Sequence, residues 1–158
     1  MKNNTNQYRG FSLIELLIIV SIIGILAAIV IPTFSNANEN AKAGALSSQI
    51  NTVKKALILY KTDHNDTYPT DAQLITNQWQ VLTNSTDIDG NTSGSDYGPY
   101  FQKPPFNAFM DSSVVAADDS AAWQYDSSNG TVQAVVPSAV YADADNLQLD
   151  TLDLVVEP

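Results

Sequence analysis

The sequence FSLIELLIIVSIIGILAAIVI, residues 11–31, decides the architecture of this chain. All of its residues are apolar except Ser12, Glu15, Ser21 and Gly24, so it carries a single charge. As a helix, the stretch spans about 30 Å, which is the thickness of the hydrocarbon core of a bilayer. A chain of 158 residues has little surface with which to cover a helix that is apolar on every side, which argues against burial in a globular core. We therefore expect a membrane-spanning helix.

Composition limits what the rest of the chain can do. Seventeen acidic residues against seven basic ones give a net charge of −10, and such a surface repels the phosphate backbone of nucleic acids. There is no cysteine, which excludes disulfides and thiolate chemistry. Lys2 and Arg9 precede the apolar run and orient its N-terminal side toward the cytoplasm.

Two alternatives compete for the apolar run. A secretory signal peptide would be cut after it, and Ser35-Asn36-Ala37 offers the small residues of a cleavage site. The run is long for a signal peptide, however, and Glu15 costs about 2.5–3.5 kcal/mol at the centre of a bilayer. A plain membrane anchor stays open, because Glu15 near one end of the span can reach the interface.

The sequence RGFSLIELL, residues 9–17, resembles the prepilin signature of type IV pilins and type II secretion pseudopilins, and the resemblance continues to Pro32. It implies that a membrane peptidase cuts after Gly10 and methylates the new amine of Phe11. It also implies that Glu15 of one subunit meets the N-terminal amine of its neighbour in a filament. Physically, a buried ammonium and a buried carboxylate are each costly alone and offset one another when paired.

The helix is expected to continue beyond Pro32, which should bend it because proline removes one backbone hydrogen bond. In the second half, apolar residues recur at alternating spacings of four and three residues, a pattern that predicts one buried stripe. The stripe consists of Leu46, Ile50, Val53, Leu57 and Tyr60. We expect this stripe to pack on the core of the head.

After the helix, DHNDTYPT (residues 63–70) predicts a stop and a turn. WQYD (123–126) and TVQAVV (131–136) flank Asn129-Gly130 and predict a β-hairpin. A further strand is expected within 147–156, after a flexible connection over residues 138–146. Residues 56–70 resemble the major pseudopilins of type II secretion, and GPYFQKPPFN (98–107) resembles a segment of small pseudopilin-like proteins.

The predicted fold is α+β: a long, bent N-terminal helix, half transmembrane and half amphipathic, packed on a small antiparallel sheet, as in the pilin fold that the resemblance implies. Residues 1–10 are the leader, 11–35 the transmembrane and assembly helix, and 36–158 the head, in which the helix continues to about residue 62.

No catalytic centre is expected, and the chain is predicted not to be an enzyme. His64 is the sole histidine, and its place just after the predicted helix end suggests a surface or capping residue. No serine lies in a recognisable nucleophile motif.

Two acidic loops are candidates for calcium, because carboxylate and amide oxygens with nearby glycines suit this cation. The first comprises Asp87, Asp89, Asn91 and Asp96, and the second, suggested by the resemblance to major pseudopilins, comprises Asp111, Asp118 and Asp119. The alternative for each is a solvated acidic loop. No other cofactor is expected.

The resemblance implies a structural subunit of a type II secretion pseudopilus that helps to drive protein export. Its expected partners are further copies of itself, other pilin-like subunits, the prepilin peptidase and the inner-membrane assembly platform. The precursor would cross the bacterial inner membrane once, with its head in the periplasm. Two alternatives stay open: a type IV pilin of a surface pilus for adhesion, motility or DNA uptake, and a monomeric membrane-anchored binding module.

Overall fold

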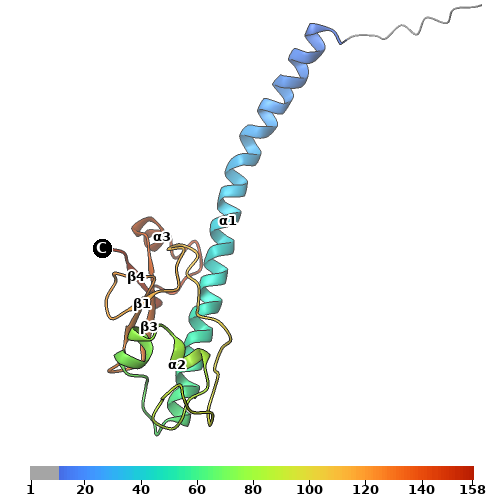
Figure 1. Cartoon of the computed structure of the whole chain (residues 1–158). Coiled ribbons are helices and arrows are strands. Elements are labelled where there is room, and N and C mark those ends of the chain that lie inside the picture. The colour runs from blue at the N-terminus through green and yellow to red at the C-terminus, as the bar shows by residue number, and fades with distance from the viewer. Residues whose placement is uncertain (1–10) are drawn as a thin grey trace, which may run out of the picture. The chain divides into compact units, whose positions relative to one another are not determined.

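The computed structural model describes residues 11–158, apart from the side chains of residues 31–36. Its longest element is the helix α1, Leu13–Asp63, of 51 residues (Figure 1). By its internal contacts the chain divides into two units, one ending at Asn38 and one formed by Glu39–Pro158, here called the head. Gly10, predicted to precede the cleavage site, lies outside the described residues. The bend at Pro32 stays a prediction.

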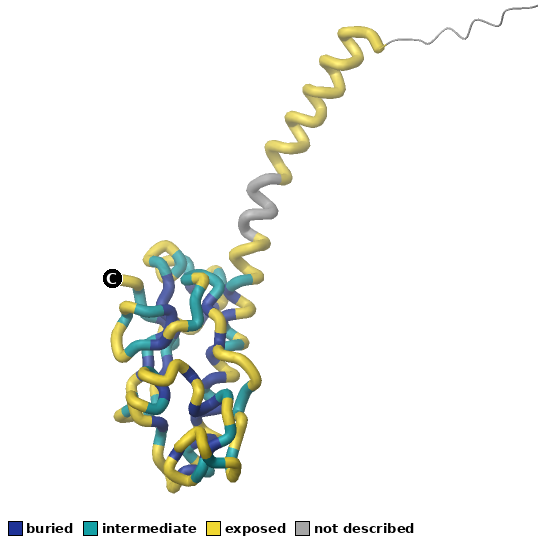
Figure 2. The backbone as a smooth tube through the Cα atoms, viewed as in Figure 1, coloured by how far each residue is buried: buried dark blue, intermediate teal, exposed yellow. Residues whose placement is uncertain are grey.

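The first part of α1 is apolar and exposed. Over Leu13–Val30 its mean hydropathy is 3.0, and none of these residues is buried (Figure 2). The hydroxyl of Ser21 donates a hydrogen bond of 2.7 Å to the carbonyl of Leu17, so this polar group is satisfied within the helix. By length and composition, this helix is long and apolar enough to cross a membrane.

The second part of α1 contributes one buried face to the core of the head. The predicted apolar stripe is confirmed, because all five of its side chains are at most 3% exposed. They pack in one core with Trp79, Trp123 and further residues of the sheet. The predicted helix stop is also confirmed, since α1 ends at Asp63.

Two short helical segments follow, η1 at Ala72–Thr76 and α2 at Gln80–Thr83. Between them lies the buried Trp79, whose indole N–H donates to the carbonyl of Ser113 at 2.6 Å. The ring of Trp79 meets that of Trp123 edge to face, with 6.0 Å between the centroids. This tryptophan pair fixes the helical segments to the sheet.

The sheet has four strands in sequence order: β1 Val115–Ala116, β2 Trp123–Asp126, β3 Thr131–Val136 and β4 Leu154–Val156. The predicted hairpin is confirmed, since β2 and β3 pair antiparallel with Asp126 opposite Thr131. In the loop between them, Gly130 adopts φ +71°, and a Cβ there would lie 2.4 Å from the ring of Tyr68. This position therefore requires glycine.

The sheet is mixed, whereas the sequence predicted an antiparallel one. β1 runs parallel to β2, and β3 runs parallel to β4. The reason for the second pairing is the connection between β3 and β4, which contains the helix α3, Ser138–Ala142, and the 3-10 turn η2, Thr151–Asp153. A crossover of this length returns the chain to the same end of the sheet. The last strand is consequently shorter than predicted, and α3 occupies the expected flexible connection.

Candidate assembly site

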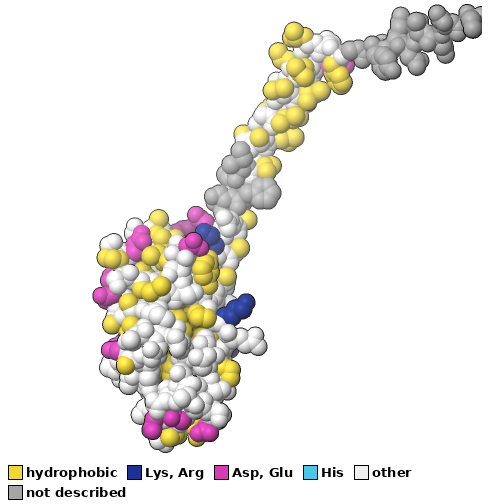
Figure 3. Space-filling view, in the orientation of Figure 1, with side chains coloured by type: hydrophobic (Ala, Val, Ile, Leu, Met, Phe, Trp, Pro, Cys, Tyr) yellow, Lys and Arg dark blue, Asp and Glu magenta, His cyan; other side chains and the backbone are white. Residues whose placement is uncertain are grey.

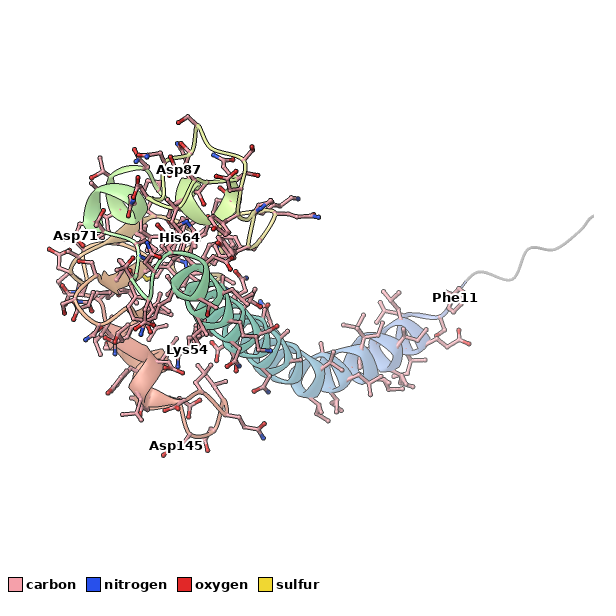
Figure 4. All side chains as sticks on the ribbon, turned by 90° about the horizontal axis from the view of Figure 1, so that it is seen from below. Phe11, Lys54, His64, Asp71, Asp87 and Asp145 are labelled. Carbon is pink, nitrogen blue, oxygen red and sulfur yellow. The ribbon has the colours of Figure 1, made fainter. Side chains whose placement is uncertain are left out.

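The N-terminal end of α1 brings Phe11, Ser12 and Glu15 together. Ser12 directly precedes the first helical residue, and its backbone N–H donates to a carboxylate oxygen of Glu15 at 2.9 Å. This is one half of a capping box, in which a glutamate at the third helical position satisfies a free N–H group. Phe11 is exposed at the very end of the described chain, as labelled in Figure 4. The spacing Ser-x-x-Glu was present in the sequence, and the prediction for Glu15 overlooked it.

Glu15 is the sole ionisable side chain among residues 11–38. It lies one helical turn from Phe11, beside the place where the predicted cleavage would create an α-amine. A carboxylate at a helix N-terminus is favoured by the helix dipole and by the free N–H groups there. The geometry thus holds one negative charge at the end of an otherwise uncharged, exposed, apolar rod. The structure leaves the pairing with a neighbouring subunit as a prediction.

His64 is a core residue, and the expectation of a surface position is wrong. It is 1% exposed, and its ring stacks on that of Tyr60 with 3.7 Å between the centroids. Nδ1 lies 2.8 Å from the carbonyl of Tyr60, which can only accept, so Nδ1 carries the proton. In the neutral imidazole, Nε2 then accepts from the hydroxyl of Thr86 at 3.0 Å. His64 therefore joins the end of α1 to the loop that carries Asp87 (Figure 4).

In the first candidate calcium loop, the carboxylate of Asp87 is bonded to its own loop. One oxygen accepts from the backbone N–H groups of Asp89 and Asn91, at 3.0 and 2.8 Å, and the other from the Asn91 amide at 2.9 Å. The pKa of Asp87 lies below its ordinary value, mainly because of the hydrogen bonds that the side chain and the backbone of Asn91 donate to the carboxylate. The backbone carbonyl of Asp89 accepts a hydrogen bond of 2.7 Å from the side-chain amide of Gln73. Asp96 bonds through its backbone to Thr86.

The second candidate set is similar. Asp118 accepts from the backbone N–H of Ser120 at 3.1 Å and from its hydroxyl at 2.5 Å, and these bonds lower the pKa of Asp118. Asp111 adopts φ +50° in a turn, and Asp119 lies beside Asp118. Over the described part of the chain, no three His, Cys, Asp or Glu side chains are grouped so that they could hold a metal ion. Calcium binding by either loop stays a prediction.

The comparisons bear mainly on the N-terminal part. Residues 5–31 match the family described as "Prokaryotic N-terminal methylation motif". No solved structure matches the chain.

Among curated proteins, the chain is 39% identical over 69 residues to "Type II secretion system core protein G" of Escherichia coli, covering 44% of this chain and 47% of that protein. It is 30% identical over 99 residues to the protein of the same name from Klebsiella pneumoniae, covering 63% of this chain and 67% of that protein. It is also 39% identical over 67 residues to the major component of the type IV wide pilus of Thermus thermophilus, covering 42% of this chain and 51% of that protein.

The match thus spans about half the length of most of these relatives, which are named as structural components and not as enzymes. This agrees with the predicted absence of enzymatic activity. The Klebsiella match extends over two thirds of that relative, well beyond the N-terminal motif. Together with the α+β head behind an exposed apolar helix, the comparisons lead to one conclusion. The chain belongs to the type IV pilin-like superfamily, as a pseudopilin-like subunit.

Proposed function

We propose that this chain is a structural subunit of a type II secretion pseudopilus, assembled through α1 to drive protein export. The observation that carries the proposal is the end of α1: an apolar helix exposed over Leu13–Val30, with one carboxylate, Glu15, at its tip. Such a helix is stable in a bilayer before assembly and among the helices of other subunits afterwards. The similarity to core protein G of secretion systems supports the pseudopilus.

Assembly begins, in this proposal, with a precursor that crosses the bacterial inner membrane once, its head in the periplasm. The prepilin peptidase removes residues 1–10 and methylates Phe11. The assembly platform in the inner membrane then extracts the subunit into the filament. There the Glu15 carboxylate forms an ion pair with the N-terminal ammonium of a neighbouring subunit, because each group would otherwise be buried without a partner.

A type IV pilin of a surface pilus is the second candidate. The similarity to the Thermus pilus component supports it. Both functions use the same α1, so the head and the genetic neighbourhood must separate them. Surface pili on cells that express the chain at native level would favour the second candidate.

Intact mass and N-terminal sequencing of the mature protein test the proposal. The expected mature chain starts at a methylated Phe11, and Gly10→Leu should leave an uncut precursor in the membrane, because the peptidase needs a small residue before the cut. A mature chain that starts at Asn38 would instead show ordinary signal-peptide processing and overturn the proposal. Electron microscopy of sheared material then decides whether the mature chain forms filaments.

A further inference from the structure

The outward face of α1 in the head is almost free of charge. Ten residues between positions 41 and 62 are exposed, and one of them, Lys55, is charged. Ile58 and Leu59 are 58% and 55% exposed on this face. The outward face of a helix in a soluble domain is usually rich in charged residues. This face is therefore suited to contact with another protein.

A hollow of about 300 Å³ flanks this face. Its lining is largely apolar and comes from α1 and from the loop between α2 and β1: Val53, Phe101, Pro104, Pro105 and Phe106. The loop is held in place by Gln49, whose amide donates to the carbonyl of Phe106 at 2.8 Å and accepts from its N–H at 2.5 Å. The hollow is thus fixed within the single copy.

All lysines of the head lie either on α1 or at the hollow. The five lysines are Lys103, which lines the hollow, and four on α1: Lys42, Lys54, Lys55 and Lys61. Lys54 pairs with Asp153, and Lys61 with Asp66 at 3.4 Å. Within the described chain, Lys103 forms no ion pair. Acidic side chains instead gather at the lower end and along the upper left margin of the head (Figure 3).

The C-terminal segment is complementary to the hollow, because it combines negative charge with an exposed apolar side chain. Residues 138–158 contain five acidic residues and no basic one. Within this segment Leu152 is 79% exposed, more than any other large apolar side chain of the head. Its N–H donates to the Asp150 carboxylate at 2.9 Å, and its carbonyl accepts from Gln133 at 3.0 Å. A rigid turn therefore presents an apolar side chain next to a negative charge.

We propose that the hollow receives Leu152 of a second copy of this chain, with Asp150 of that copy beside Lys103. The inference rests on the proposed filament and names one contact between its heads. Burial of an exposed leucine in an apolar hollow supplies affinity, and the opposite charges at the rim fix its register. The two surfaces differ, so each copy can bind one neighbour at each, and such head-to-tail contacts produce an open filament.

Cross-linking of the full chain tests this contact, because the chain has no cysteine of its own. Thr52→Cys, at an exposed residue that lines the hollow, combined with Thr151→Cys keeps Leu152, Asp150 and Lys103 and places a thiol on each surface. A short bismaleimide should then link filaments into a ladder of dimers, trimers and longer products. The control pairs Thr151→Cys with Val114→Cys, an exposed position outside the proposed contact, and should give no ladder.

Filament yield gives a second measurement. Leu152→Asp should lower the yield at least tenfold, whereas Val114→Asp, also at an exposed apolar residue, should assemble like the parent chain. If the parent forms filaments but neither the ladder nor the effect of Leu152→Asp appears, the contact is overturned and the filament function stands. If the processed parent chain forms no filaments, both are overturned.

Discussion

Replacing Glu15 by glutamine or leucine separates the two roles that the structure and the proposed filament give to this residue. Glutamine keeps an oxygen for the N–H of Ser12, so the cap that the structure shows survives, whereas leucine removes it at a cost of about 0.5–2 kcal/mol. Both substitutions remove the negative charge. In the filament this leaves a neighbour's buried ammonium unpaired, which costs about 3–5 kcal/mol. The association constant should therefore fall by about two to four orders of magnitude for both variants.

The assay compares processing and assembly in the same cells. Intact mass should show that the parent, Glu15→Gln and Glu15→Leu are all cut to the chain beginning at Phe11, since cleavage does not need the carboxylate. The yield of sheared filaments should be high for the parent alone. If Glu15→Gln assembles as well as the parent while Glu15→Leu does not, Glu15 acts as a cap, and the charge-pairing argument is wrong.

Three further predictions concern a soluble fragment, residues 36–158, that contains the head. His64→Phe should lower its free energy of unfolding by about 1–3 kcal/mol in urea denaturation, because the buried hydroxyl of Thr86 loses its partner. Adding Thr86→Val should recover part of this loss, and an equal or larger loss in the double variant would refute the proposed bond. Gly130→Ala should cost about 1–3 kcal/mol owing to the positive φ and the ring of Tyr68, and an unchanged melting temperature would contradict this. If Asp87 acts in its loop alone, Asp87→Ala lowers the melting temperature equally in chelator and in millimolar Ca²⁺, whereas a calcium site requires a loss that appears with Ca²⁺ but not with equal Mg²⁺.

The helix was the most predictable part of the fold, because its signals are local. The apolar run before Pro32 follows from its length and composition, and the stripe from Leu46 to Tyr60 follows from periodicity over a few turns. The hairpin was also local, with Asn129-Gly130 between two short β patterns. These features depend on neighbours in the sequence and need no knowledge of distant contacts.

The mixed sheet and the place of His64 could not be predicted in this way. Whether β4 runs parallel or antiparallel to β3 depends on how residues 137–153 cross the head, and that path depends on tertiary packing. His64 looked exposed because it follows a helix end. It is buried because a loop more than twenty residues later provides Thr86, and no local pattern carries that information.

The outward face of α1 also distinguishes a filament subunit from a monomeric membrane-anchored module. In a monomer this face would remain in water, and selection for solubility favours charged residues there. The chain instead has Ile58 and Leu59 exposed and a single charge among the ten exposed residues from position 41 to 62. The head does not lack charge, since residues 39–158 carry sixteen acidic side chains. Charge is therefore sparse at the fully exposed positions of α1 in the head, although the head as a whole is highly charged, as expected if these positions contact other subunits.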